Sequence, residues 1–317
     1  MAAPSLSKHS IVGFSIQSAY DTPNTANIRW VPFAAGSLTF GQAGTNQLFE
    51  QSNRADWPTE VIADGDFASG DIPMIFRPDT NTLTDLVDWV QTRDVYNQCK
   101  WATVYIVERV DGTDRVEAWQ DVKIQRMTIS VQGGQAAEVS LTCVGRKEYT
   151  GHGVSAPANT DYGAPLIWSG AAITASWDAG SYVADVDFEQ VTFVYETNAD
   201  DPLNGHRIAG SLNPTRIWNT GGERVSIDTT RDFVDLTYKT AFDSHLRSGP
   251  DAGVYDLGLK LVLTGTAVLT ITCPRISIQS HPRSMQGGTN VRNTEDITFD
   301  ALGSADGSTR PATMVVS

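Results

Sequence analysis

The residues of this chain that could do chemistry are few and scattered. Its five histidines share no helical or short spacing with one another or with the three cysteines, which predicts no metal site. They are His9, His152, His206, His245 and His281. Carboxylates two residues apart, Asp64 with Asp66 and Asp185 with Asp187, could serve glycoside hydrolysis, which needs two carboxylates across a cleft. A chain with 37 acidic residues contains such pairs in any case, so a β-rich hydrolase is kept only as an alternative.

Glycine pairs and tryptophans are the other candidates for a binding site. The pairs at Gly133, Gly221 and Gly287 lack the frame of a phosphate-binding loop and are typical of turns. Trp89 and Trp119 fall in a helix and a strand, which favours core packing. Three tryptophans near expected loops could stack on sugar rings, namely Trp30, Trp57 and Trp218. We therefore expect no enzyme and no cofactor, and keep a carbohydrate-binding or adhesin module as a second alternative.

The composition limits the class of protein further. With 23 basic and 37 acidic side chains the net charge is −14, which argues against binding nucleic acid through its phosphates. A hydrophobic fraction of 40% is enough for real cores. The sequence has no apolar run long enough to span a membrane, and its N-terminal segment lacks the apolar stretch of a signal peptide, so we expect none. Its three cysteines fit synthesis in a reducing compartment.

The chain repeats itself, which predicts a duplicated domain. The string IQRMTISVQGG at 124–134 is answered by IQSHPRSMQGG at 278–288, and VSLTCVG at 139–145 by ITFDALG at 297–303. Upstream, LTF at 38–40 is answered by VTF at 191–193 at nearly the same offset. We predict a first domain over 1–150, a linker over 151–164 and a second domain over 165–317.

Each copy is expected to be mainly β with one helix. In copy one, alternating segments flank the turn Asp111-Gly112, and in copy two they flank Thr264-Gly265, so each predicts an antiparallel hairpin. The segment 79–90 predicts a helix with Leu83, Leu86, Val87 and Val90 on one face and a capping box between Thr82 and Asp85. Its counterpart carries a weaker stripe of Tyr238, Ala241, Phe242 and His245.

Four polar segments are predicted to be mobile in the free subunit and to order on assembly. They are the long loops 41–71 and 196–223 and the terminal arms 1–10 and 304–317.

The order of these segments resembles a known family. IVGFSIQSAYDTPNT leads to Trp30-Val31-Pro32, followed by a long polar loop, the strand SGDIPMIF, one helix, a hairpin and a QGG-linked strand pair. This order is similar to that of the tail tube (major tail) proteins of bacteriophages with long, non-contractile tails. The resemblance covers about 10–148 and recurs over 165–303.

The resemblance implies two tandem β-sandwich or barrel domains, each made of two sheets with a flanking helix. It also implies a structural subunit of the virion tail, made in the host cytoplasm, that polymerises as stacked rings forming a conduit for genome ejection. The implied partners are the chain itself, the tape measure protein and transiting duplex DNA in the lumen, and the tail terminator and distal tail proteins, with no membrane. Two domains per chain predict trimeric rings with pseudo-sixfold symmetry instead of hexamers.

Strand alternation around the hairpins and before the QGG turns predicts which residues face solvent or the lumen. In copy one these are Glu108, Glu117, Asp121, Lys123 and Gln125. In copy two they are Lys260, Arg275, Ser277 and Gln279. Copy two is the more basic there, so copy one would supply most of the repulsion of DNA.

Overall fold

A computed structural model describes most of the chain. The described residues are 11–32, 38–43, 45–49, 60–65, 67–75, 79–110, 113–158, 171–176, 182–185, 187–200, 216–248, 258–284, 293–304 and 308–317. The described part is mainly β with two helices, as predicted from the sequence. Its elements fall into two groups, called copy one and copy two below.

Copy one holds ten strands and one helix. They are β1 Ile11–Ile16, β2 Arg29–Pro32, β3 Gly41–Gln42, β4 Thr45–Phe49, β5 Glu60–Gly65, β6 Ala68–Ile75, α1 Thr80–Gln91, β7 Ala102–Val110, β8 Thr113–Gln132, β9 Glu138–Gly145 and β10 Lys147–Glu148.

Copy two also holds ten strands and one helix. They are β11 Ala171–Ser176, β12 Val183–Ala184, β13 Phe188–Glu196, β14 Arg224–Asp232, α2 Thr237–Ser248, β15 Gly258–Thr264, β16 Val268–Cys273, β17 Ile276–Ser280, β18 Arg283–Ser284, β19 Thr294–Ala301 and β20 Thr313–Val316.

The strand pairing of copy one recurs in copy two. β1 pairs with β2 and β7, as β11 pairs with β12 and β15. β6 pairs with β3 and β9, as β14 pairs with β13 and β19. The first part of β8 corresponds to β16 and its second part to β17, since they pair with β7 and β9 as β16 and β17 pair with β15 and β19. The recurrence is what a duplication would produce, while the domain boundaries stay a prediction.

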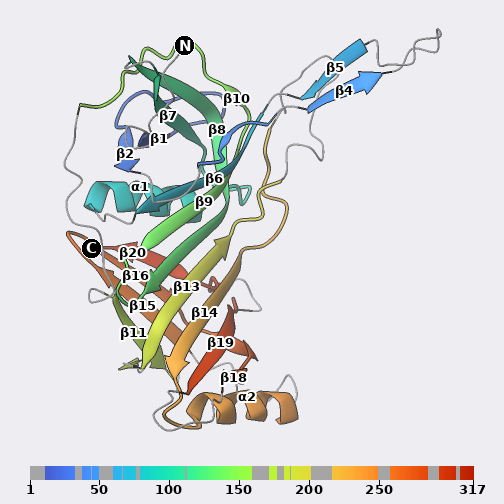
Figure 1. Ribbon diagram of the computed structural model, residues 1–317. Coiled ribbons are helices and arrows are strands. Elements are labelled where there is room, and N and C mark those ends of the chain that lie inside the picture. The colour runs from blue at the N-terminus through green and yellow to red at the C-terminus, as the bar shows by residue number, and fades with distance from the viewer. Residues whose placement is uncertain are drawn as a thin grey trace.

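One sheet runs through both copies. Its order is β17-β19-β14-β13-β8-β7-β1-β2, with β9, β6 and β3 joined to it through β8. The copies meet where β8 pairs with β13 in antiparallel register, from Gln132 opposite Gln190 to Arg126 opposite Glu196. Figure 1 shows β8 and β9 leading into β13 and β14 as one surface, behind which β11, β15, β16 and β20 lie as a second sheet.

The helices form where the apolar stripes predict them. Leu83, Leu86 and Val90 of α1 are buried, and Val87 packs against the core. The capping box is wrong: Asp79 caps α1 by accepting from the backbone N–H groups of Asn81 and Thr82, one turn before the predicted pair. In α2, Tyr238 is buried and Ala241 and Phe242 are partly buried, whereas the side chain of His245 lies outside the described residues.

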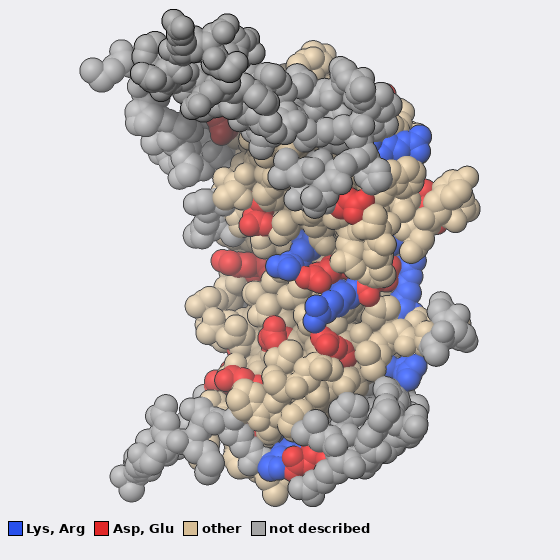
Figure 2. Space-filling model, turned by 90° about the vertical axis from the view of Figure 1, so that its right-hand side faces the viewer, with Lys and Arg blue, Asp and Glu red and all other residues tan. Residues whose placement is uncertain are grey.

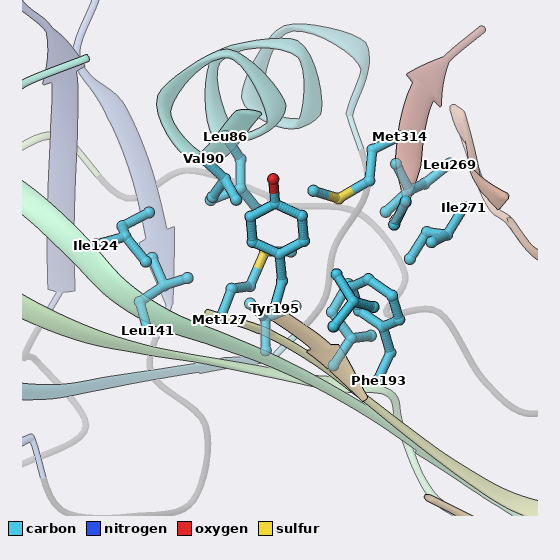
Figure 3. Packing of buried hydrophobic residues seen from close by; sticks show 14 of the residues in the cluster. Leu86, Val90, Ile124, Met127, Leu141, Phe193, Tyr195, Leu269, Ile271 and Met314 are labelled. Atoms are coloured by element: carbon cyan, nitrogen blue, oxygen red, sulfur yellow. The ribbon is translucent and has the colours of Figure 1, made fainter. Parts of the chain in front are cut away.

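The hydrophobic core is shared by both copies. Figure 3 shows Tyr195 of β13 between Leu86 and Val90 of α1, Met127 of β8 and Met314 of β20. Its ring points toward the helix of the other copy. Trp89, predicted to be in the core, is buried, stacks on Phe14 and donates from Nε1 to the carbonyl of Val122 at 3.1 Å. The two copies therefore exclude water from one continuous apolar interior.

Polar contacts also join the copies. Gln91, at the end of α1, donates from Nε2 to the carbonyl of Ala312 at 2.9 Å and accepts from the backbone N–H of Met314 at 3.0 Å. The side-chain amide of Gln91 thus forms hydrogen bonds with the backbone at β20 like those that a neighbouring strand would form. Arg93 forms an ion pair with Glu223, with 3.0 Å between Nε and Oε1.

The four segments predicted to be mobile have different outcomes. Residues 1–10 and 201–215 lie outside the described part. The segment 41–71 holds β3 to β5 and the start of β6, and in Figure 1 the β4–β5 hairpin projects from the sheets. The expectation of a mobile arm is wrong at its C-terminal end, because Thr313–Val316 form β20, which pairs with β16.

Both predicted hairpins are present as antiparallel pairs. Val110 lies opposite Thr113, so β7 and β8 flank Asp111-Gly112, a turn that lies outside the described residues. Thr264 lies opposite Val268 at the end of the β15–β16 pair. The first QGG turn follows β8 with Gly134 at a φ of 79°, while the second, at 286–288, lies outside the described residues.

Candidate functional surface

Two of the predicted surface residues, Asp121 and Lys123, do not face solvent in this chain. They are 1% and 0% exposed. The alternation fails because Asp121 has a φ of 55° and the register of β7 with β8 shifts between Ala102 and Val104. The carboxylate of Asp121 instead accepts from Nε of Arg146 at 2.6 Å and from the backbone N–H of Asp21 at 2.8 Å.

Lys123 belongs to a buried polar cluster at the contact between the copies. Its Nζ donates to Oε1 of Gln98 at 2.9 Å and to Oδ1 of Asn219 at 2.7 Å, and lies 5.0 Å from the ring centre of Trp101. Burial lowers the pKa of Lys123 to about 8, because removal from water disfavours the charged ammonium group. The residue is an internal link between the copies in the single chain.

The remaining predicted residues are spread over several strands. Glu108 and Glu117 are exposed on the β7–β8 hairpin, where Glu117 accepts from Nε1 of Trp119. Gln125 is half-buried and donates to the carbonyl of Ala199, across the contact between the copies.

In copy two, the predicted residues also lie apart. Lys260 of β15 and Arg275 after β16 are half-buried, and Arg275 donates to the carbonyl of Gly303. Gln279 of β17 is exposed and donates to Ser277, which is itself buried. The predicted set thus does not form one surface within the chain.

A coherent polar surface lies on the large sheet, opposite its buried side. Along the second part of β8 and along β9, β13, β14 and β19, buried residues, most of them apolar, alternate with half-buried or exposed ones. We call the second set, with the equivalent residues of β6, the polar face. Its four rows of neighbouring residues are Asp71–Thr142–Arg126–Glu196–Arg224, Pro73–Ser140–Thr128–Val194–Ser226–Asp300, Ile75–Glu138–Ser130–Thr192–Asp228–Thr298 and Gln132–Gln190–Thr230–Asp296.

Hydroxyl groups hold several carboxylates of the polar face across neighbouring strands. Thr142 donates to Asp71 at 2.6 Å. Thr230 donates to Asp296 and Thr298 to Asp228, each at 2.8 Å. Figure 2, which views the molecule from the right-hand side of Figure 1, shows acidic side chains scattered among uncharged ones, with basic side chains between them. The polar face is thus mainly hydroxyl and carboxylate groups.

Comparison with known proteins decides the family. Residues 30–301 match the family model described as phage tail tube protein. The chain belongs to the phage tail tube protein family. The resemblance found in the sequence is therefore confirmed, and the chain is a structural component of a bacteriophage tail. No curated protein sequence matches it.

Membership of the tail tube family implies self-assembly into a tube and association with other tail components. Such a protein needs surfaces for its own copies and for the tube interior. Among the described residues no group of three or more His, Cys, Asp or Glu side chains could hold a metal ion. In the same part of the chain, neither helix has the length and apolarity needed to cross a bilayer.

The polar face of this tail tube subunit includes residues that the sequence analysis did not select. The most informative are Asp228, Asp296 and Asp300 of copy two, which give this surface of copy two several carboxylates. Their signal was available, because RVSIDTTRD and TEDITFDA place polar residues at every second position. Alternation within a strand does not reveal which strands pair, so it could not place these residues on one surface.

Two of the three tryptophans considered for sugar stacking are described, and each packs against a side chain of this chain. Trp30 packs near Tyr105, with 6.1 Å between ring centres. Trp218 is half-buried and lies against the guanidinium group of Arg216 at 5.3 Å. Trp57 lies outside the described residues.

Proposed function

We propose that three chains close a ring with pseudo-sixfold symmetry and that stacked rings form the conduit for genome ejection. The observation that carries the proposal is the pairing of β8 with β13 between the copies. β17 and β18 together correspond to the second part of β8, β3 corresponds to β13, and both edges lie at the outside of the described sheet. The β17–β18 edge of one chain can therefore pair with the 38–43 segment of the next chain.

Such a contact is head-to-tail, since two different edges meet. Repeating it closes a ring if the rotation at each step is right, and closure pairs the two edges that meet in this contact. Each chain supplies two copies of the same unit, so three chains supply six. This count supports the trimer over the hexamer formed from single-domain subunits.

The polar face is our candidate for the lumen wall. The four rows contain six carboxylates and two arginines, an excess of negative charge. Duplex DNA carries one negative charge per ~1.7 Å of its axis, so a negative wall of hydroxyls and carboxylates would repel it and offer little to hold it. The tape measure protein would occupy the same lumen before ejection, and the terminator and distal tail proteins would close the two ends of the tube.

A cysteine pair across the proposed contact tests the ring. Within the chain, Thr192 lies opposite Ser130, with 3.5 Å between their hydroxyl oxygens. The repeat offsets make Thr39 and Ser284 the corresponding residues between chains, and these are again a threonine and a serine. In T39C/S284C tubes, mild oxidation should give linked chains up to a closed trimer.

The matched control is T192C/S130C, which should form the same bond within one chain. The native cysteines Cys99, Cys143 and Cys273 are all buried, which limits side reactions. Linked species of six chains, or six chains per ring in electron microscopy, would refute the trimer. Intact rings without any cross-link would refute the pairing of the β17–β18 edge with the 38–43 segment.

A further inference from the structure

Both arginines of the polar face lie in one row, at the contact between the copies. The row places Glu196 of β13 between Arg126 of β8 and Arg224 of β14. Nε and Nη2 of Arg126 lie 3.1 and 2.8 Å from Oε1 of Glu196. Nη2 of Arg224 lies 3.9 Å from Oδ1 of Asp300.

These ion pairs contribute little to folding. The side chains of Arg126 and Arg224 are 56% and 67% exposed, and exposed ion pairs typically contribute less than about 1 kcal/mol. Their effect on the surface is larger. An exposed guanidinium group is the best side chain for binding phosphate, because its N–H groups match two phosphate oxygens at once.

Glu196 occupies the edge of Arg126 that a phosphate would use. Nε and one Nη nitrogen form one of the two donor edges of a guanidinium group suited to paired contacts, and both of these nitrogens face the same carboxylate oxygen. The charges of Arg126 and Arg224 are balanced by Glu196 and Asp300. The other carboxylates of the polar face accept from hydroxyls or lie opposite them on a neighbouring strand.

We propose that Glu196 masks Arg126, beside an Arg224 that is paired with Asp300, so that the polar face does not bind the phosphates of duplex DNA. The inference rests on the proposed function, in which this face meets the passing genome. Without the carboxylate, two arginines on strands either side of β13 form a phosphate-binding site that slows passage. Glu196 is thus a residue that sets specificity by preventing an interaction.

The test compares two variants with the same change of charge. E196Q removes the masking carboxylate and keeps the size of the side chain. E138Q is the matched control, because Glu138 is an exposed residue of the polar face that lies opposite Ser130. No lysine or arginine of the described residues forms an ion pair with it. Binding of a short DNA duplex to the purified, unassembled subunit is measured by fluorescence anisotropy at 20 to 150 mM salt.

We expect E196Q to bind the duplex roughly tenfold more tightly than the wild type at low salt, with the slope of log affinity against log salt steeper by about one to two. E138Q should stay close to the wild type, and R126Q/E196Q should return to it. Equal binding by E196Q and E138Q would mean that net charge alone acts, which overturns the proposal, as would no gain in E196Q.

The same variants in assembled tubes separate this inference from the proposed function. E196Q should slow DNA passage in a salt-dependent way. Tighter binding by the E196Q subunit with unchanged passage would place the polar face outside the lumen, which contradicts the proposed function and leaves the masking intact. If E196Q forms normal trimeric rings and its unassembled subunit binds DNA no more tightly than the wild type, only the masking by Glu196 is contradicted.

Discussion

The two copies differ most where the chain passes from one sheet to the other. In copy one, β8 continues through Asp121, whose left-handed backbone bends the strand without ending it. In copy two, the chain stops at Cys273 and resumes at Ile276, with Pro274 between them. Asp121 and Pro274 each lie ten residues after the start of their hairpin turns. The same strand pairing is therefore reached by two different backbone conformations. The topology is kept in both copies, whereas the residues at the crossing are specific to each copy.

The copies also bury charge differently. In copy one Arg146 contacts Asp121 and Asp21. In copy two Arg231 lies 2.5 Å from Glu295, which also lies 2.8 Å from Nε2 of His281. Both copies bury an arginine, yet the partners come from different elements. Removing the partner of a buried charge lowers the free energy of unfolding strongly, so substitutions at these sites test the difference between the copies.

The largest effect is expected from E295A. This change removes the carboxylate closest to Arg231, whose side chain is 3% exposed, while Asp187 and Asp185 remain 3.4 and 3.7 Å away. Breaking a buried ion pair typically costs about 3 to 5 kcal/mol, and we expect a loss near the lower end of this range because these two carboxylates stay. Urea denaturation of the purified subunit measures the loss. R126A is the control, because its exposed ion pair should contribute less than about 1 kcal/mol. Equal losses in the two variants would contradict the role of burial.

Substitutions at Asp121 and Pro274 test whether the two copies need different backbone conformations where the chain passes between the sheets. D121P should cost at least about 3 kcal/mol, because proline cannot adopt a φ of 55° and would remove the N–H that donates to Oε1 of Gln17. It also removes the carboxylate that pairs with Arg146. P274A should cost no more than about 1 kcal/mol, since it only frees the unfolded chain. Thermal unfolding of both variants checks the ratio. A D121P subunit as stable as P274A would show that the two positions are interchangeable.

The smallest effect is expected for the pH dependence of the stability that Lys123 contributes at the contact between the copies. The folded-state pKa of Lys123 is about 8 against an ordinary value of 10.5, so the unfolded chain binds more protons between these values. Its contribution to stability therefore rises with pH over that window, by at most about 3 kcal/mol.

The measurement is the difference in unfolding free energy between the wild type and K123M at several pH values. Burial raises the pKa of Tyr105, Tyr195 and Cys273, so the tyrosines and this cysteine destabilise the fold at high pH, but they contribute equally to both proteins and cancel. The difference should move in favour of the wild type from pH 8 to 10.5. A difference independent of pH would mean that Lys123 is not desolvated.

Local patterns were enough to predict the helices, both hairpins and the family. Each depends on residues close in sequence, such as the stripe of α1 or the alternation before Thr264. The burial of Asp121 and Lys123 was not predictable in this way. One depends on a left-handed backbone, and the other on amide groups from Gln98 and Asn219, which are brought together only by the fold. The polar face could not be predicted for the same reason, because its rows run across strands from both copies.

The length of β8 has a mechanical consequence. Its 20 residues extend over roughly 65 Å at about 3.3 Å per residue, and it pairs with β7, β9, β10 and β13. A pull along this strand loads many hydrogen bonds in shear at once, whereas a pull on the short outer strands β2 and β3 opens their few bonds one by one. Under a stretching force the outer strands should therefore separate first, while β8 transmits the force from one copy to the other.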